Sequence, residues 1–487
     1  MLDPIANQAE ALELALQYHR SRNFHQAEQI YRQILHHNPD CLEALHLLGT
    51  IAFQMGHPEA AIEHYQQVLA LDPDYVWVYN DMGIALRMQG QIEAAIAAYR
   101  KALTLKPDCA ESHYNLGNAL QLQDRCDEAI LCQQQAIALK PDFSRAHYNL
   151  GRLFHEQGDL TDAMTCYERA IVLNPEDVDF RWNLAIALLT MGELKRGFAE
   201  YEWRWQLRDN LPRPFSAPLW EGSPLAGKTI LLHAEQGFGD TLQFIRYATL
   251  VAQRGGQVVV ECQPALIRLL ATVDGVQQVV ARGDTLPDFQ VHAPLLSLPR
   301  ILGTELQTVP AQIPYLKPPA IAFKLDCSAD RRLKIGLVWA GNPKRENDQL
   351  RSCTLAQFSR LLNIEGIAFY SLQKGPKAAE LSQMPQCSDR IQDLSHHLND
   401  FADTAAIVAQ LDLVITVDTA VAHLAGGLGK PTWVLLSHSA DWRWLLDRVD
   451  NPWYPSMRLF RQKQAGKWED VVNCVAEALQ EVRKCEG

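Results

Sequence analysis

Two segments of the chain place acidic and hydroxyl side chains directly after short apolar runs, where strands would deliver them to a site. The first reads His-Ala-Glu-Gln-Gly-Phe-Gly-Asp-Thr over residues 233–241. Gly237 and Gly239 let a strand turn sharply into a helix, and the free N–H groups at the helix N-terminus suit an anion or a sugar hydroxyl. Asp240 is then either a first-turn carboxylate stabilised by the helix dipole or a general base facing a cleft. Taken alone, the segment favours the first interpretation.

The second segment runs from residue 412 to 431 and takes a strand into a helix at Asp418 and Thr419. Thr419 and His423 are four residues apart, so they share a helix face and lean toward the helix N-terminus. A diphosphate would fit at that corner. Taken singly, His423 is more commonly a core histidine and Asp418 an N-cap. It is the combination that indicates a binding site.

The elements that would position these residues follow from the pattern of the C-terminal part, where short apolar runs alternate with helical stretches. This alternation predicts two parallel, doubly wound sheets. The runs are 229–233, 257–262, 276–280 and 289–292 in the first block, and 335–340, 367–372, 413–417 and 432–436 in the second. Ligands of such sheets bind at the carboxyl ends of the strands, so two facing halves would bring both segments to one cleft.

The N-terminal part repeats with a period of 34 residues. The columns in phase are Pro39, Pro73, Pro107, Pro141 and Pro175; Gly49, Gly83, Gly117, Gly151 and Ala185; and Tyr65, Tyr99, Tyr167 and Tyr201. Small residues let two antiparallel helices approach, tyrosines fill the space between them, and proline ends the second helix. The pattern resembles the tetratricopeptide repeat, with six units from about residue 8 to 208. We therefore expect an α-solenoid followed by an α/β region.

One polar column of the repeats consists of Asp81, Asn115, Asn149 and Asn183. It lies in the first helices, which line the inner wall of such arrays. Amides there can bind the backbone of an extended peptide, because each offers a donor and an acceptor. This arrangement resembles that of the O-linked N-acetylglucosamine transferases. Solvated positions, or hydrogen bonds between repeats, explain the column equally well.

Proline-rich stretches suggest the domain boundaries. We expect a solenoid over residues 1–208, a connector over 209–227, a half over 228–318 that takes the acceptor, and a half over 319–487 that takes the donor. The last repeat departs from the pattern with Gly197 and the aromatic residues Tyr201, Trp203 and Trp205, which predicts a seam against the next domain. A final helix over 469–484 is expected to dock across the two halves.

Composition narrows the class of protein. The chain has 487 residues and a formal net charge of −12, without the basic stripe of a nucleic-acid-binding protein. Its 11 cysteines include no Cys-x-x-Cys pair, which argues against a disulfide framework and a zinc site. The N-terminus lacks the order of a signal peptide, and no apolar run is long enough to span a bilayer. We expect a cytoplasmic protein with no bound metal.

The Gly-Asp turn and the Asp-Thr-x-x-x-His-Leu-Ala helix together resemble the ADP-heptose lipopolysaccharide heptosyltransferases of the GT-B fold, over roughly residues 228–487. The resemblance implies that Asp240 activates the acceptor hydroxyl, and that Asp418, Thr419 and His423 hold the sugar and diphosphate of the donor. Ala420 stands at the family's usual glycine. The whole layout is closer to bacterial proteins in which tetratricopeptide repeats precede a heptosyltransferase-like domain.

A loop over residues 339–352 fits the same scheme. GT-B enzymes usually work without a bound metal, so fixed cations are expected to neutralise the leaving diphosphate. Lys344, Arg345 and Arg351 follow a predicted strand and offer charge and directed N–H bonds. The resemblance selects Lys344 for this role, whereas surface solvation is the plain alternative.

Two further positions are candidates for contacts with the ribose and base. Gln373 follows a predicted strand, and Leu394 follows Asp393 in a possible further strand. Both are weaker predictions than the two motifs, because only their place after a strand supports them.

The sequence thus predicts a glycosyltransferase that uses a nucleotide-sugar as substrate and needs no further cofactor, and the resemblance implies that it is metal-independent and inverting. The solenoid would select a protein or glycan acceptor and bind protein partners. A repeat scaffold with a degenerate, nucleotide-binding transferase domain is the alternative from another class. An NAD enzyme, based on Gly237, Gly239 and Glu261, is a third possibility.

Overall fold

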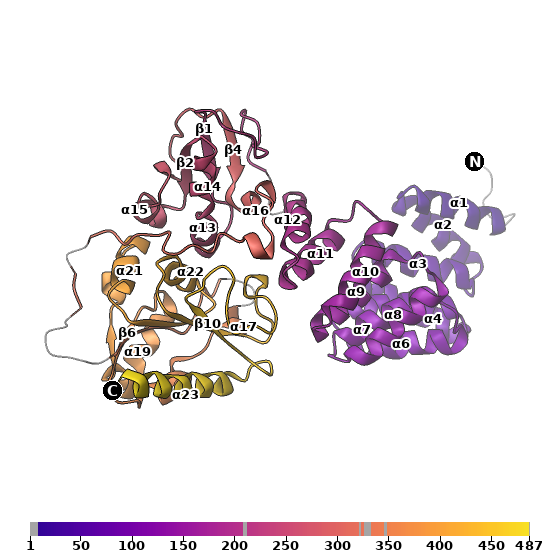
Figure 1. Cartoon of the computed structure of the whole chain (residues 1–487). Coiled ribbons are helices and arrows are strands. Elements are labelled where there is room, and N and C mark those ends of the chain that lie inside the picture. Colours follow the sequence, from indigo (N-terminus) through magenta and orange to yellow (C-terminus); the bar gives the residue numbers. More distant parts are fainter. Residues whose placement is uncertain (1–7, 208–211, 321–322, 326–332, 345–347, 487) are drawn as a thin grey trace. The chain divides into compact units, whose positions relative to one another are not determined.

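The computed structural model describes residues 8–207, 212–320, 323–325, 333–344 and 348–486. The chain forms two compact units, Met1–Leu184 and Ala185–Gly487. The first unit ends before the boundary predicted at residue 208, because α12 (Leu194–Tyr201) packs within the second unit, where Phe198 contacts Phe244. Figure 1 labels the elements of both units.

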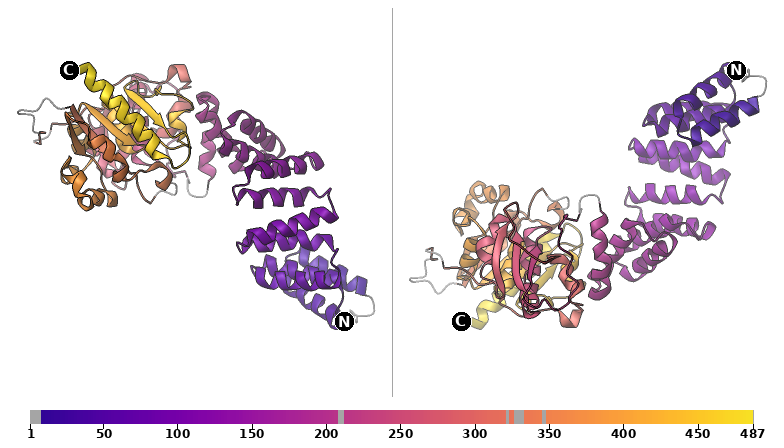
Figure 2. Two further views of the ribbon diagram at one scale, coloured as in Figure 1. Left: turned by 90° about the horizontal axis from the view of Figure 1, so that it is seen from below. Right: turned by 90° about the horizontal axis from the view of Figure 1, so that it is seen from above.

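The first unit is a stack of paired helices (Figure 2). Its helices are α1 (Gln8–Arg20), α2 (Phe24–His37), α3 (Leu42–Gln54), α4 (Pro58–Leu71), α5 (Val76–Met88), α6 (Ile92–Leu105), α7 (Ala110–Gln121), α8 (Cys126–Leu139), α9 (Ser144–Gln157) and α10 (Leu160–Leu173). Helix α11 (Val178–Thr190) crosses the division between the units. With α12, the described helices of this array make the six pairs that the period predicts.

Small residues and tyrosines pack against each other inside the repeats, as their periodicity predicts. A Cβ added to Gly83 would lie 2.5 Å from Cε1 of Tyr99, and one added to Gly151 would lie 2.7 Å from Cε1 of Tyr167. Only glycine permits this approach, because a Cβ atom at these distances would overlap with the tyrosine ring. The tyrosines are buried, so each of these repeats has its own aromatic core residue.

In four repeats the turn before the first helix is closed by a side-chain donor six residues after the periodic proline. The proline carbonyl accepts a hydrogen bond of 2.8–3.1 Å from Tyr79, His113, His147 or Arg181 in successive repeats. Four repeats therefore close the same turn with three side-chain types. This column of donors was not apparent from the sequence, because its members share a function and not a residue type.

The first half of the second unit contains a parallel four-stranded sheet in the order β3-β2-β1-β4. Its strands are β1 (Thr229–His233), β2 (Gln257–Cys262), β3 (Val276–Ala281) and β4 (Val291–Pro294), and its helices are α13 (Phe238–Phe244), α14 (Tyr247–Gln253), α15 (Ile267–Leu270) and α16 (Leu298–Ile301). Strand β4 lies two residues later than predicted, so that Ala293 and Pro294 extend the pairing with β1.

The second half contains a parallel six-stranded sheet in the order β10-β9-β8-β5-β6-β7. Its strands are β5 (Leu333–Val338), β6 (Ile367–Ser371), β7 (Ile391–Asp393), β8 (Leu413–Val417), β9 (Thr432–Leu436) and β10 (Met457–Arg461). Its helices are α17 (Asp348–Arg351), α18 (Ser359–Leu362), α19 (Ala379–Gln383), α20 (Pro385–Ser388), α21 (Phe401–Val408), α22 (Ala420–Gly427) and α23 (Trp468–Glu486). Helix α23 packs into the core of this half through Val471, Val475 and Leu479, which differs from the predicted docking across both halves.

A buried arginine joins the two halves. The Nη1 of Arg246, which precedes α14, donates to the carbonyl of Trp453 at 2.6 Å and to that of Pro310 at 3.1 Å. The guanidinium also lies 4.4 Å from the ring centroids of Tyr315 and Tyr454. Its charge is thus enclosed by carbonyl oxygens and aromatic faces drawn from both halves and the segment that connects them.

Candidate active site

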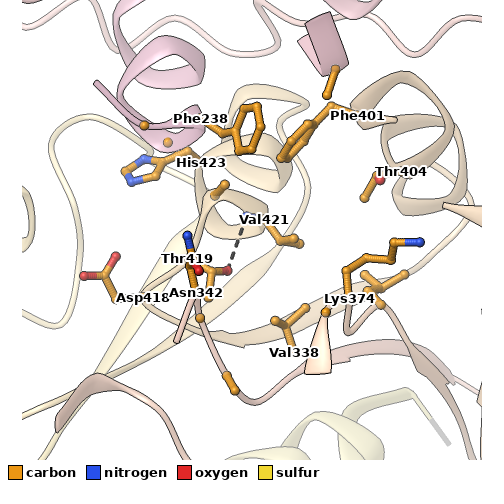
Figure 3. A pocket seen from close by; sticks show the side chains of 18 of the residues that line it. Phe238, Val338, Asn342, Lys374, Phe401, Thr404, Asp418, Thr419, Val421 and His423 are labelled. Carbon is orange, nitrogen blue, oxygen red and sulfur yellow. Dashed lines mark hydrogen bonds between the residues drawn. The ribbon is translucent and has the colours of Figure 1, made fainter. Parts of the chain in front are cut away.

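A cavity of about 680 Å³ lies at the carboxyl ends of strands from both sheets. The turn after β1, the segments after β5 and β6, the start of α22 and the segment around residue 441 contribute its lining. Figure 3 shows side chains of several of these segments around the same space. The structure therefore brings the Gly-Asp turn and the Asp-Thr helix together, at the place where doubly wound sheets bind ligands.

Asp240 lines this cavity and holds two partners at once. One carboxylate oxygen, Oδ2, accepts the backbone N–H of Gly237 at 2.9 Å and caps α13. The other, Oδ1, accepts Nη2 of Arg443 at 2.5 Å. Asp240 thus caps the helix and also faces the cavity, which the sequence analysis treated as alternatives. Both are possible because a carboxylate oxygen with one partner keeps a second lone pair.

Arg443 is a site residue that the sequence analysis missed. Its side chain is 8% exposed and also donates to Oδ1 of Asp441 at 2.8 Å. Burial alone would lower the pKa of the Arg443 guanidinium, but the charges of Asp441 and Asp240 raise it above its usual range. Among the residues that the structure describes, its Nε finds no hydrogen-bond partner. The aspartate of the Gly turn is therefore held beside a permanent cation.

The start of α22 provides a second group of residues that line the cavity. Thr419 is the N-cap, and its Oγ1 accepts the backbone N–H of Val421 at 3.3 Å. Asp418 precedes the cap and lines the cavity with Thr419 and Ala420. The cap is thus Thr419 and not Asp418, which corrects the alternative role considered for that aspartate. Figure 3 shows Asp418, Thr419 and Asn342 among the side chains that line the cavity. The positive end of the helix dipole faces this corner.

His423 is buried beneath the Gly turn. Its Nδ1 lies 3.0 Å from the hydroxyl of Tyr454, and its ring stacks on Trp444 with centroids 5.3 Å apart. Burial raises the pKa of Tyr454 well above its usual value, so this hydroxyl keeps its proton and can donate it to Nδ1. A Cβ on Gly239 would lie 2.9 Å from Cδ2 of His423. Glycine is therefore required for the close approach of the imidazole to the turn.

Gln373 lines the cavity, but its amide is already used. Its Oε1 accepts the backbone N–H groups of Trp339 and Ala340 at 3.0 and 2.9 Å. Its Nε2 donates to the carbonyls of Ala340 and Lys374, each at 3.0 Å. All four hydrogen bonds of an amide side chain are thus made within the protein. This side chain therefore braces the turns after β5 and β6, and its amide has no spare hydrogen bond for the predicted ribose contact.

Two other predicted donor contacts are also corrected. Leu394 is fully buried, and it is not among the residues that line the cavity, although its cluster neighbours Leu372 and Leu398 are. Lys344 is exposed and does not belong to the cavity lining. Arg345 lies outside the described residues. Proximity to a strand end was not sufficient to predict the orientation of these side chains.

Other cations do line the cavity. Arg351 does so while its Nε donates to Oδ1 of Asp348 at 3.1 Å. Lys374, which the sequence analysis missed, lies in the segment after β6, and its Nζ donates to the carbonyl of Ser395 at 3.0 Å. An exposed lysine with a single neutral acceptor keeps its charge available for an anionic ligand.

Two phenylalanines meet over the cavity. Phe238 begins α13 and Phe401 begins α21, so they come from different halves, and their ring centroids lie 4.9 Å apart (Figure 3). Phe238 is 39% exposed. On the same side, Arg268 donates to Asp400 and Asp403 at 2.9 and 3.0 Å. These contacts tie the rims of the two halves together.

The NAD alternative finds no support at Glu261. This carboxylate is 1% exposed and forms an ion pair with Arg213. It does not belong to the cavity lining, whereas a ribose-binding acid must face the ligand.

The polar column of the solenoid makes hydrogen bonds between neighbouring repeats. These are Asp81 with His46 at 2.8 Å, Asn115 with Asn80 at 3.0 Å, Asn149 with Asn118 at 2.7 Å and Asn183 with Tyr148 at 3.0 Å. This pattern is the one expected if the column stabilises the stacking of the repeats. Each amide has further hydrogen-bonding capacity, so binding of a peptide stays a hypothesis.

Within the part of the chain that the structure describes, no cluster of three or more His, Cys, Asp or Glu side chains has the geometry to hold a metal ion. The described helices also include none with the length and hydropathy of a membrane span.

Comparison with known proteins agrees with the repeat architecture. A family model described as TPR repeat matches residues 49–90, 85–124, 122–158 and 151–192. The N-terminal part of the chain is a tetratricopeptide-repeat array. Its 34-residue period and paired helices are thereby explained, and such arrays characteristically present extended surfaces to protein partners.

Individual relatives are more distant. The chain is 27% identical to Protein FlbA of Caulobacter vibrioides over 338 residues, covering 60% of this chain and 54% of that protein. It thus spans about half the length of this curated relative. A thermophilic TPR protein of Thermus thermophilus is 27% identical, with 38% of this chain and 100% of that chain covered and a TM-score of 0.32. For MamA the values are 26% identity, 33% and 95% coverage, and a TM-score of 0.31.

Proposed function

We propose that this chain is a glycosyltransferase of the GT-B fold, which moves a sugar from a nucleotide-diphosphate donor to a hydroxyl acceptor. The observation that carries the proposal is the 680 Å³ cavity, which joins Asp240 of one half with Asp418, Thr419 and His423 of the other. A reaction between two bound substrates needs such an arrangement, because each half can present one reactant to the other.

The proposed chemistry is a direct displacement. Asp240 takes the proton of the acceptor hydroxyl as its oxygen attacks the anomeric carbon, and the bond between that carbon and the diphosphate oxygen breaks. The charge that develops on the leaving diphosphate is stabilised by the N-terminus of α22 capped by Thr419, and by the cations Lys374 and Arg351. Inversion of configuration follows from a single displacement.

The role of Lys374 gives a prediction with a built-in control. Lys374→Ala should weaken binding of a nucleoside diphosphate by about tenfold, and binding of the nucleoside much less, because the lost partner is a phosphate. Lys344→Ala should leave both affinities nearly unchanged, since Lys344 does not line the cavity. Isothermal titration calorimetry with both ligands distinguishes these outcomes. Equal losses for nucleoside and diphosphate in Lys374→Ala would rule out a phosphate contact.

The proposed function is tested in two steps. Thermal-shift measurements against a panel of nucleotide sugars and free nucleotides identify the donor, because a ligand that binds only the native state raises the melting temperature. Release of nucleoside diphosphate from that donor is then followed with and without candidate acceptors. A donor that binds but never turns over would contradict the enzymatic assignment.

The alternative is a repeat scaffold whose transferase domain binds nucleotide without catalysis. The ion pair between Asp240 and Arg443 favours it, because Oδ1 of the proposed base is already engaged by a guanidinium and the acceptor hydroxyl would have to compete with that contact. Binding without turnover for every donor would support this second function.

The solenoid is proposed to select the acceptor. Replacing Asn115, Asn149 and Asn183 together by alanine should raise KM for a large protein acceptor while sparing slow hydrolysis of the donor, because the cavity is built from the second unit. A melting curve of the same variant measures the cost of losing the hydrogen bonds between repeats. An unchanged KM would assign the column to the stacking of repeats alone.

A further inference from the structure

The last helix of the repeat array contacts two segments of the cavity: the Gly turn, which contains Asp240, and the segment that contains its partner Arg443. Helix α12 and the following turn of 3-10 helix, η1 (Glu202–Gln206), lie in the second unit with the cavity. Their side chains reach the start of the Gly turn on one side and the segment that carries Arg443 on the other. Neither contact is needed to complete a repeat.

Arg204 fixes the first residue of the turn. Its side chain is fully buried, and its Nε and Nη2 donate to the two carboxylate oxygens of Glu235 at 2.9 and 3.2 Å. Glu235 also accepts the backbone N–H of Leu296 at 3.1 Å. A buried bidentate pair defines both distance and orientation, so Glu235 is held in one place relative to η1.

Tyr201 fixes the next residue. Its hydroxyl accepts Nε2 of Gln236 at 3.2 Å, and Gln236 lines the cavity. The carbonyl of Gln236 in turn accepts Nε2 of Gln263 at 2.7 Å, and Oε1 of Gln263 accepts the hydroxyl of Thr241 at 3.0 Å. Thr241 directly follows Asp240, so a chain of hydrogen bonds runs from the repeat to the proposed base.

The same helix also packs on the partner of Asp240. Trp442 precedes Arg443, and its ring meets Phe198 edge-on with centroids 5.6 Å apart and Tyr201 with centroids 6.3 Å apart. One short helical segment thus contacts residues next to both members of the ion pair between Asp240 and Arg443, which come from different halves.

We propose that Tyr201 and Arg204 are positioning residues for the proposed transfer reaction, so that the last repeat is a working part of the active site and not only a support for acceptor binding. The inference rests on the proposed function in one respect, the role of Asp240. The proposal also requires that α12 and η1 keep the Gly turn ordered. This order can be measured in a protein that shows no turnover.

The test uses the full chain carrying Tyr201→Phe, which removes one hydroxyl and leaves the aromatic packing. Amide hydrogen exchange over residues 235–241 should become about fivefold faster, while exchange in β2 stays unchanged. The kcat for transfer should fall about tenfold with KM for the donor unaltered, because a displaced base harms the chemical step and not donor binding.

Tyr167→Phe is the matched control, because Tyr167 is the buried tyrosine of the same phase in the preceding repeat, and its hydroxyl faces His155 of its own repeat at 3.4 Å. Arg204→Lys is a second variant that keeps the charge but loses the bidentate geometry, and it should produce the same pattern. Exchange over 235–241 that matches the control in both variants overturns the inference. If exchange is faster in both variants but the protein shows no turnover with any donor, the role of α12 and η1 in ordering the turn is supported. The proposed function, and not this inference, is then contradicted.

Discussion

Turnover of sugar transfer should fall by about 100-fold or more in Asp240→Asn, while affinity for the nucleoside diphosphate changes little. The amide is nearly isosteric with the carboxylate, but it cannot accept a proton from the acceptor hydroxyl. Steady-state rates with the donor found by thermal shift, together with calorimetry of the diphosphate, give both quantities.

Asp441→Asn is the matched control for this experiment. Asp441 and Asp240 both accept hydrogen bonds from Arg443, so each asparagine variant removes one ion pair from the same guanidinium. Only Asp240 is proposed to carry the proton. A loss of turnover that is equal in the two variants would mean that the carboxylates act by holding Arg443, and the assignment of the base would be wrong.

The second large effect concerns stability. In Arg443→Met the free energy of unfolding should fall by about 3 kcal/mol, because two partly buried carboxylates lose their shared cation while the aliphatic stem is retained. Urea denaturation followed by tryptophan fluorescence measures this, since Trp442 and Trp444 flank the site of substitution.

Arg448→Met is the control, because Arg448 pairs with Asp450 at the surface, where such pairs contribute about 1 kcal/mol or less. If Arg443→Met were no more destabilising than Arg448→Met, the buried pair with Asp240 would not be a fixed feature of the site. Asp240, the proposed base, would then be held less firmly than its contacts indicate.

The sequence predicted most of the fold because its signals are local. The runs that became β1, β2, β8 and β9 have the predicted bounds, since each is a short apolar segment with breakers at its ends. Strand β10 was not recognised as a strand, because Arg458 and Arg461 interrupt its apolar character. Only pairing with β9 at the edge of the sheet explains it.

The sequence could place a residue in the cavity only where that residue follows a parallel strand, because the carboxyl ends of such strands meet at one edge of the sheet. Asp240, Thr419 and His423 reach one cavity because each follows a parallel strand of the predicted sheets. Arg443 was missed because its partner Asp240 lies 203 positions away in the sequence. The amide of Gln373 is used within the protein and Lys344 lies outside the cavity lining, because a position after a strand does not fix where a side chain points or which atoms it bonds to.

The enclosure of Arg246 has a consequence for how substrates come and go. Rotating the two halves apart would separate its guanidinium from the carbonyl of Trp453 and leave a buried cation with fewer partners, at a cost of several kcal/mol. For the proposed reaction, exchange of nucleotide and product is therefore expected to proceed by local movement at the rim, where Phe238 meets Phe401. The contact of these two rings and the ion pairs of Arg268 at the same rim would then limit product release, and substitutions of the rings should alter turnover while leaving the chemical step unchanged.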